Sequence, residues 1–488
     1  MAVPLGHVRA VTPAARIGAA ARGTGTRAAT PAISLGAAAL TIALIFGVAF
    51  VVPQPVWHGQ PARPAPAASA PADLSSAVDW LGLGLALVYA LAWSLPFRPY
   101  ARAQALAGAV SPRVLLGLTA GLAVVALLVF PGFGSDVFIY VDYARLWAIY
   151  GEHPLLTAPI AQPADWAFQF IWIPYQPSPY GPLWAALTWP IARVAGTSVA
   201  AQVAGYKLLA LASYVACCWL IWSWPAHQAH RARALLLFAW SPLVLFETLA
   251  KGHNDVLMAL SALLAFRLGS RGGLVAALAG GLVKATGLAV LPSIALGLVR
   301  RRAWLPLASS GLVAAALAVA AYAPFWVGPE TLLPILAQTS RVVWSPGSLL
   351  IAAGADAGAV RVLLAVVWAA TCGVVLWRVR DPLESACLVL LATFLLLTTA
   401  FFAHYLVPVI ALAAVSQNGP LQRVISALSL GAMAAYAVEL LNLAFGPAFI
   451  GSASFQILGS LVLLVPVAVL VMTGLRPPAP VTQPRAPR

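Results

Sequence analysis

The sequence predicts an all-α membrane protein that crosses the bilayer many times. Of its 488 residues, 62% are hydrophobic and only 8% are charged, a balance that no water-soluble fold could bury. The apolar segments run for about 15–25 residues, which suits helices across a bilayer and not barrel strands. Counting these segments gives a polytopic fold of about 12–14 transmembrane helices, with a helical loop outside the cytoplasm.

The charge distribution indicates a membrane partner and excludes a nucleic-acid partner. A formal charge of +15 comes from 28 basic residues against 13 acidic ones. The arginines lie in short connections between apolar runs, as expected of cytoplasmic connections, and no nucleic-acid-binding motif accompanies them. The four cysteines lie in apolar segments without metal or disulfide spacing, so we expect them to be packing residues.

Composition divides the chain into five parts. Both tails and the N-terminal linker lack the apolar content of a packed core, and residues 34–52 are long enough for a retained anchor. The parts are a disordered cytoplasmic tail (1–33), N-terminal spans with a Pro/Ala-rich linker (34–113), a transmembrane module carrying the candidate chemistry (114–300, with an extracytoplasmic loop at 132–202), a C-terminal transmembrane module (301–475) and a disordered tail (476–488).

Charge parity places the loop 132–202 outside the cytoplasm. Basic residues at 98–113 and again at 230–233 mark cytoplasmic connections. An odd number of crossings must therefore join the loop to 230–233, yet two apolar segments lie between them. The first, 181–200, is short and contains two prolines, so we expect it to lie along the outer interface while 203–224 crosses.

The apolar segment 273–299 raises the same parity question. Arginines flank it on both sides and indicate cytoplasmic connections, which one crossing cannot join. We expect two short helices that meet near Lys284, with this lysine close to the outer face. The count then places the loop 132–202, residues 251–255, Lys284 and residues 404–405 on one side, which indicates a single extracytoplasmic site.

Acidic residues concentrated in the outer loop point most directly to chemistry. Ser135 is a candidate N-cap, so Asp136 would begin a helix whose free amides favour an anion. A capping acid that has no catalytic role is the alternative. Of the 13 acidic residues in the chain, four lie in this stretch: Asp136, Asp142, Glu152 and Asp165.

Aromatic residues follow Asp136 on one face of the predicted helix. Tyr140, Tyr143 and Trp147 lie four, seven and eleven positions after it. A carboxylate beside such a stripe is typical of a sugar-binding surface, because apolar sugar faces stack on aromatic rings. An interfacial aromatic belt would give the same pattern.

Two further segments contain candidate substrate-binding residues. The Pro- and Tyr-rich loop 173–184, with Tyr175 and Tyr180, would shape an acceptor groove or form an interfacial turn. In Lys251–Asp255, Lys251 and His253 would hold a phosphate, and Asn254 or Asp255 would orient these two side chains; a polar turn is the alternative.

Lys284 lies inside an otherwise apolar run, where an ionisable residue indicates function unless its side chain snorkels to the interface. His404 and Tyr405, at the end of a span, would bind substrate or belong to an aromatic belt. Three more acids lie within or near spans and have no assignment: Asp79, Glu247 and Glu439.

Together these elements resemble the GT-C superfamily of polyprenyl-phosphate-sugar-dependent glycosyltransferases, and its bacterial mannosyltransferases in particular. The resemblance covers residues 114–410. It rests on Gly134–Val137 with Tyr143 and Leu146, Pro177–Leu183, Gly252–Asp255 with Leu257 and Met258, and Val283–Lys284 before Leu291 and Pro292.

The resemblance implies a hexosyltransferase of GT-C type with its active site outside the cytoplasm. Asp136 corresponds to the catalytic base, which takes a proton from an acceptor hydroxyl that attacks C1 of a lipid-phosphate-linked sugar, mannose by resemblance, with inversion. Lys251, His253 and Lys284 would stabilise the phosphate leaving group. Many relatives carry two adjacent acids where this chain has Ser135 and Asp136, so Asp142 is the candidate second acid.

The expected partners are a polyprenyl-phosphate-linked sugar donor, a glycan or glycolipid acceptor and membrane lipids. We expect no cofactor and no metal, since a phosphate monoester leaves without a nucleotide-type divalent ion and the sequence shows no ligand cluster. A transporter or flippase of lipid-linked sugars is the competing class, because broken helices and intramembrane acids suit it. A non-catalytic assembly partner is the third.

Overall fold

Helices account for the regular structure of the protein. Across the described residues there is no β-strand, only two isolated β-bridges, so the predicted all-α fold is confirmed. The predicted Pro/Ala-rich linker within 48–79 and the tail 476–488 lie outside the described residues. The computed structural model describes residues 24–47, 80–131, 135–171, 173–225, 230–338, 341–446 and 449–474.

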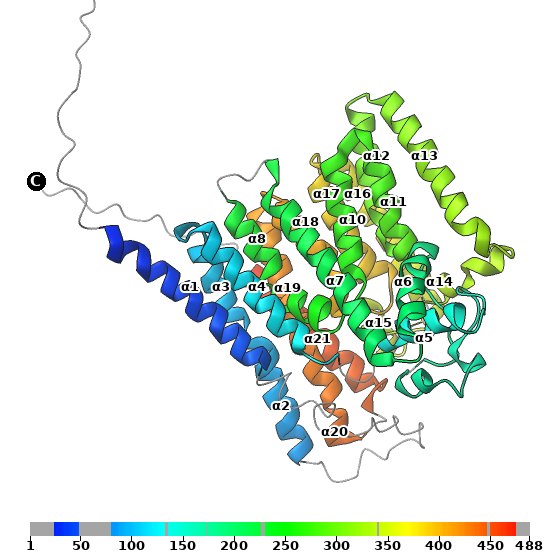
Figure 1. Cartoon of the computed structure of the whole chain (residues 1–488), viewed down its shortest axis with the longest axis horizontal. Coiled ribbons are helices and arrows are strands. Elements are labelled where there is room, and N and C mark those ends of the chain that lie inside the picture. The colour runs from blue at the N-terminus through cyan, green and yellow to red at the C-terminus, as the bar shows by residue number, and fades with distance from the viewer. Residues whose placement is uncertain are drawn as a thin grey trace, which may run out of the picture.

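The N-terminal helices lie together along one side of the molecule (Figure 1). The first of them begins at Thr24, inside the tail that we expected to be disordered to residue 33; residues 1–23 are not described. These helices are α1 (Thr24–Phe46), α2 (Trp80–Ser94), α3 (Phe97–Leu106) and α4 (Pro112–Leu128).

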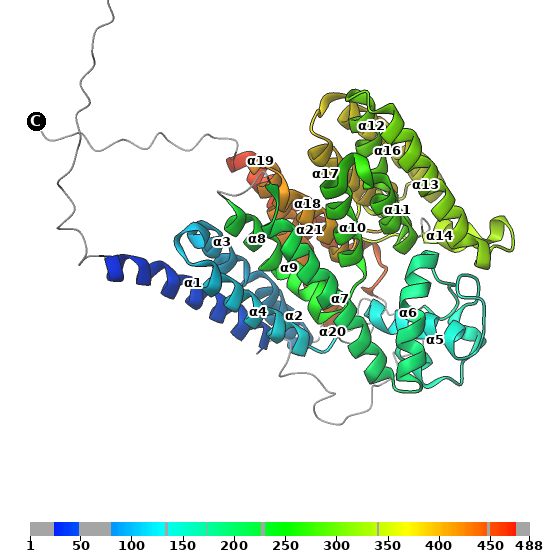
Figure 2. The same cartoon turned by 45° about the horizontal axis from the view of Figure 1, so that its top comes forward.

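The central helices surround the candidate site. Helices α5 and α6 pack on each other and group at the end of the molecule away from α1 (Figure 2). The helices are α5 (Asp136–Ala148), α6 (Pro182–Ala195), α7 (Val199–Trp222), α8 (Arg231–Ala239), α9 (Pro242–Val244) running into a π-helix (Leu245–Ala250), α10 (Asp255–Leu268), α11 (Gly273–Val283) and α12 (Leu291–Arg300).

The C-terminal half completes the bundle. Its helix α18 is buried along all ten residues, so the short turn Ala403–Tyr405 before it is fixed deep in the protein. The helices are α13 (Trp304–Tyr322), α14 (Leu333–Ala337), α15 (Pro346–Ala352), α16 (Ala357–Arg378), α17 (Pro382–Ala392), α18 (Leu406–Val415), α19 (Gly419–Leu440), α20 (Asn442–Phe445) and α21 (Ala453–Gly474).

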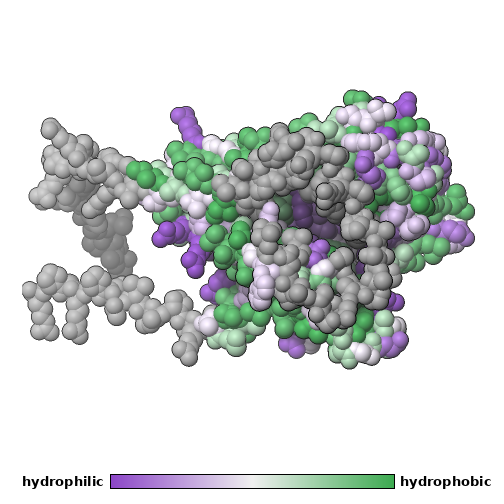
Figure 3. All heavy atoms as spheres, turned by 90° about the horizontal axis from the view of Figure 1, so that it is seen from below, coloured by the Kyte–Doolittle hydropathy of each residue, from purple (hydrophilic) through white to green (hydrophobic). Residues whose placement is uncertain are grey.

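Membrane embedding follows from the length and exposure of these helices. Helix α13 is nearly unburied over its apolar length, and Leu305 and Leu312 expose 79% and 73% of their surface, as lipid-facing side chains do. Hydrophobic side chains are interspersed with polar ones over the coloured part of the face seen in Figure 3. Five described helices are long and apolar enough to span a bilayer: α7, α13, α16, α19 and α21.

The predicted count of 12–14 spans remains a prediction. Helix α8 and the segment Pro242–Ala250 add a sixth candidate if their 47° bend lies within one span. Six shorter apolar helices between 10 and 17 residues long accompany them, of which Pro112–Leu128 and Ala403–Val415 are two. Membrane character is thus confirmed, while the number of crossings is not tested by helix length.

The segment 273–299 folds as two helices that meet at Lys284, as charge parity predicted. Helix α11 ends at Val283, a 3₁₀ turn covers Ala285–Val290, and α12 follows. The turn folds tightly against α11, because a Cβ on Gly287 would lie 2.5 Å from the carbonyl carbon of Gly280. Only glycine permits that approach.

Helix α6 also has the length expected of it. Its 14 residues span about 21 Å, short of the roughly 30 Å of a hydrocarbon core. Pro182 begins the helix, and Gly196 follows its end with a φ of 57°, a conformation that favours glycine. The chain therefore turns directly into α7, the first long candidate span after the loop.

Candidate functional site

Asp136 begins helix α5, as the sequence predicted. Ser135 occupies the N-cap position, but its hydroxyl makes no capping hydrogen bond and is buried. The free amides of the first turn favour the carboxylate electrostatically. The phenol of Tyr180 donates a hydrogen bond to Oδ2 of Asp136 at 3.1 Å, which fixes the carboxylate against the loop that precedes α6.

A backbone contact joins that loop to the break at Lys284. Tyr180 and Lys284 form an isolated antiparallel bridge, and the amide of Gly181 donates to the carbonyl of Val283 at 3.0 Å. A Cβ on Gly181 would lie 2.2 Å from the carbonyl oxygen of Leu282, so this approach requires glycine. Two segments about a hundred residues apart are thereby locked together.

Lys284 points into the protein, so it does not snorkel to an interface. Its Nζ donates to Oδ1 of Asp255 at 3.0 Å and to Oδ2 at 3.3 Å. The same Nζ lies 4.4 Å from the ring centroid of Tyr405. Asp255 is fully buried, so its charge depends on this lysine for compensation.

Glu247 forms a second polar centre on the other side of the histidines. It is fully buried and lies in the π-helix Leu245–Ala250, an irregularity frequent at functional sites. Tyr436 donates a 2.7 Å hydrogen bond to its Oε1. Lys251 Nζ lies 4.0 Å from that oxygen and 4.0 Å from the centroid of the Tyr436 ring.

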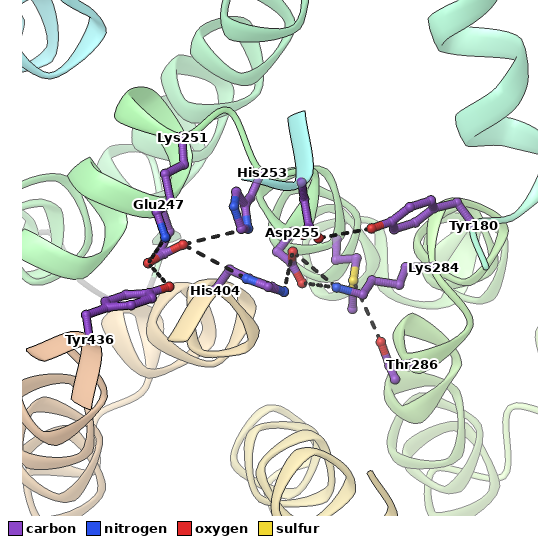
Figure 4. Close-up of polar contacts among 11 residues, drawn as sticks. Tyr180, Glu247, Lys251, His253, Asp255, Lys284, Thr286, His404 and Tyr436 are labelled. Carbon is purple, nitrogen blue, oxygen red and sulfur yellow. Dashed lines mark hydrogen bonds and ion pairs between the residues drawn. The ribbon is translucent and has the colours of Figure 1, made fainter. Parts of the chain in front are cut away.

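Two buried imidazoles lie between these centres (Figure 4). The rings of His253 and His404 have centroids 4.2 Å apart. Their Nδ1 atoms lie 3.7 Å and 4.0 Å from Oε2 of Glu247, and Nε2 of His404 lies 3.9 Å from Oδ2 of Asp255. The histidines thus connect both acids into one polar cluster inside an apolar bundle.

A cavity of about 420 Å³ opens beside this cluster. Its polar lining includes Asp136, Tyr180, Lys284, Arg341 and His404. Its apolar wall is formed by side chains from the 3₁₀ turn and the C-terminal half: Leu288, Pro292, Leu336, Trp368 and Leu397. The cavity therefore suits a substrate with one charged and one apolar part.

Most of the predicted site residues converge on one cluster, while the side of the membrane that this cluster faces stays a prediction. Two residues that sequence reasoning left without a role belong to it. Glu247 was noted but not assigned, although a lone acid in an apolar run is itself a signal. Arg341 lines the cavity and donates to Oε1 of Gln176. No sequence pattern distinguishes it from an ordinary arginine at a membrane interface.

Asp142 does not join this cluster. It is buried on α5 and does not line the cavity. Arg145 lies 2.8 Å from Asp165 instead, in an ion pair. Burial, with repulsion from Asp165, raises the pKa of Asp142 to about 7, although Arg145 opposes the shift. Burial also disfavours the charged form of Asp165, but its hydrogen bonds from Arg145, Ala167 and Tyr150 prevail and lower its pKa.

The aromatic stripe after Asp136 is not the open sugar-binding surface that the spacing predicted. Tyr140 and Tyr143 expose only 1% and 5% of their surface. Tyr140 packs edge-on against Tyr180, and Tyr143 donates to the carbonyl of Gln176 at 2.7 Å. Helical spacing identified one face correctly, but that face packs against the loop and helix α6.

Two other predicted residues lie at the edges of the site. Tyr175 is 77% exposed and does not line the cavity. Asn254 is buried, and neither its amide oxygen nor its amide nitrogen has a hydrogen-bond partner within the described part of the chain. Such a group at the start of α10 is available to a polar ligand.

Fold and site together define a membrane enzyme that brings an acid, imidazoles and cations to a cavity with an apolar wall. Residues 33–300 match the family model described as alpha-(1→6)-mannopyranosyltransferase, N-terminal domain. The match covers more than half of the chain, so the protein belongs to this mannosyltransferase family of GT-C type, and the resemblance read from the motifs is confirmed. No curated protein and no solved structure matches the chain.

Proposed function

We propose that this mannosyltransferase takes mannose from a polyprenyl-phosphate donor and transfers it to a hydroxyl of a glycan or glycolipid acceptor on the extracytoplasmic face. The family description suggests an α-(1→6) product. The cavity beside Asp136 is the observation that carries the proposal. Its lining combines a carboxylate and cationic side chains with an apolar wall, as an amphiphilic donor requires.

Positive charge at the polar end would receive the donor phosphate. Lys284 and Arg341 both line the cavity, and an ammonium group keeps a further N–H after bonding both oxygens of Asp255. The leaving phosphate gains charge as the C1–O bond breaks, so cations fixed there lower the barrier. The prenyl chain would lie along Leu288, Leu336 and Leu397.

Asp136 is proposed as the general base. Its carboxylate lies in the same cavity as Lys284, and Tyr180 holds one of its oxygens. In a single displacement the acceptor oxygen bonds to C1 as its proton passes to Asp136, and the C1–O electron pair leaves with the phosphate. A β-linked donor then gives an α-mannoside.

The acceptor would approach from the loop that carries Tyr180. Tyr175 of that loop presents an exposed ring, which is available to stack on a sugar of the acceptor. Arg341 donates to Gln176 of the same loop, so this loop forms part of the cavity rim. We therefore assign the acceptor to the part of the cavity that this loop borders.

The proposal is tested with purified protein in detergent or nanodiscs. Polyprenyl-phosphate-[¹⁴C]mannose is supplied with a short α-mannoside acceptor, and GDP-mannose serves as the matched alternative donor. Label in the acceptor from the lipid donor only, in an α-(1→6) linkage by NMR, is the expected result. Transfer from the nucleotide sugar, or none from the lipid donor, would overturn the donor assignment.

A further inference from the structure

Three potential metal ligands meet beside the cavity, and two of them, Asp136 and His404, line it. Asp136, His253 and His404 each offer one ligand atom, and these atoms lie within 4.8 Å of one another. They come from the start of α5, the segment before α10 and the turn before α18. Because more than a hundred residues separate each from the next, no spacing in the sequence revealed the set.

The two imidazoles have unused ligand atoms. His253 and His404 are 3% and 4% exposed, yet neither ring nitrogen of His253, nor Nδ1 of His404, has a hydrogen-bond partner within the described ranges. Leaving a buried polar atom unsatisfied costs about 1–3 kcal/mol. Both Nδ1 atoms face Glu247, so Nε2 of His253 is the buried ring nitrogen that is left for a ligand to satisfy.

Glu247 lies where a carboxylate can support two metal-binding histidines. Such a carboxylate accepts a hydrogen bond from the ring nitrogen that does not bind the metal. Oε2 of Glu247, which has no hydrogen-bond partner among the described residues, lies 3.7 Å and 4.0 Å from the Nδ1 atoms of the two rings. A carboxylate that accepts from Nδ1–H fixes the tautomer in which Nε2 is the free donor atom. Tyr436 holds the other oxygen of Glu247, so this support is itself anchored.

We propose that Asp136, His253 and His404 bind one divalent first-row transition-metal ion. Two imidazoles and a carboxylate favour Mn²⁺, Fe²⁺ or Zn²⁺ over Mg²⁺ or Ca²⁺, which prefer oxygen ligands alone. Three protein ligands leave coordination positions open toward the cavity. From the sequence we expected no metal, because no ligand cluster is visible there. The proposed ion departs from that expectation.

The role of the ion rests on the proposed mannosyl transfer. A non-bridging oxygen of the donor phosphate would bind to the ion at an open coordination position. The ion and Lys284 would then together stabilise the negative charge that develops on the leaving phosphate. The bonds that form and break are those of the displacement already described. One oxygen of Asp136 would face the ion while the other remains to accept the proton.

Metal binding can be measured without any transfer reaction. The full-length protein is stripped of metal with a chelator and titrated with Mn²⁺, and the free ion is followed by electron paramagnetic resonance. In a second experiment, the Zn²⁺ that stays bound after dialysis is counted by mass spectrometry. We expect one ion per chain. His404→Gln and Asp136→Asn should each weaken binding at least 10-fold, whereas His230→Gln, a histidine outside the cluster, should leave it unchanged.

Glu247→Gln keeps the size of the side chain and should weaken binding by about 10–100-fold if Glu247 orients the rings. Thermal unfolding of every variant checks that it folds. Absence of stoichiometric binding by the folded wild-type protein, or equal binding by folded His404→Gln, would overturn the site. Full transfer by metal-free protein would overturn its catalytic role, whereas an ion bound without any transfer would contradict the proposed function alone.

Discussion

Substitutions in the pair formed by Lys284 and Asp255 can distinguish a structural role of Lys284 from a catalytic one. Lys284→Met removes the ammonium group that bonds both oxygens of Asp255. Asp255 is fully buried, so the substitution leaves an uncompensated charge inside the bundle. Breaking a buried pair on one side costs about 3–5 kcal/mol, and we expect a loss of that order in the stability of the single variant.

Replacing both partners avoids this cost. The double variant Asp255→Asn/Lys284→Met leaves two neutral side chains, so most of the lost stability should return. If Lys284 also stabilises the departing phosphate, transfer should not return with it. Loss of such an interaction is worth about 2–4 kcal/mol, or roughly 30- to 1,000-fold in kcat/KM.

The assay combines thermal unfolding in detergent with initial rates of transfer from the lipid donor. Asp255→Asn alone is the matched control, because it keeps the lysine while removing its partner. A double variant that recovers stability but stays slow supports the phosphate role. If the double variant transfers mannose at the rate of Asp255→Asn, Lys284 serves the fold alone and the reasoning fails.

Three further predictions concern other parts of the protein. Gly181→Ala should lower both the melting temperature and transfer, because its Cβ would overlap the carbonyl of Leu282; unchanged values would contradict the tight junction. Burial raises the pKa of Asp142 from 3.8 to about 7 in the folded protein, so folding stability should decline as pH rises from about 4 to 7. Asp142→Asn should therefore gain up to about 4 kcal/mol over the wild-type protein above pH 7 and nothing below pH 4; parallel pH profiles would refute this. Cysteine introduced at exposed Trp166 should react with an impermeant thiol reagent applied to intact cells, and cysteine at exposed Arg302 should not; equal labelling would contradict the proposed orientation.

The elements that the sequence predicted best are those set by strong local rules. The break at Lys284 and the short helix after Gly181 followed from charge parity and segment length, and both are present. Asp136 was placed at a helix start by the N-cap rule, although Ser135 makes no capping bond. Local patterns thus located the segments that build the site.

What the sequence could not supply was the direction in which side chains face. Tyr140 and Tyr143 share a helical face with Asp136, but that face packs inward against the loop. Glu247 and Arg341 enter the site only through tertiary packing, which no single-sequence periodicity records. The meeting of His253 and His404 arises in the same way, from segments about 150 residues apart.

Asp136 is the residue that we propose removes the proton from the acceptor hydroxyl. Asp136→Asn keeps the size of the side chain and can still begin α5, so the variant should fold and bind the lipid donor. Losing a general base lowers the rate by about 10²–10⁴-fold. Asp356→Asn is the matched control, because this exposed acid caps α16 far along the chain and asparagine caps equally well.

The most direct measurement is the single-turnover rate of mannose transfer from the lipid-phosphate donor by the wild-type protein, Asp136→Asn, Asp142→Asn and the control. Metal ion is supplied at a concentration that saturates every variant, so that a change in metal binding does not enter the comparison. Under that condition we expect a loss of about 10²–10⁴-fold for Asp136→Asn, with donor affinity retained and the other two variants close to wild type. Near-normal transfer by folded Asp136→Asn would show that Asp136 is not the base, and loss of transfer in Asp142→Asn alone would assign the base to Asp142, in the middle of α5.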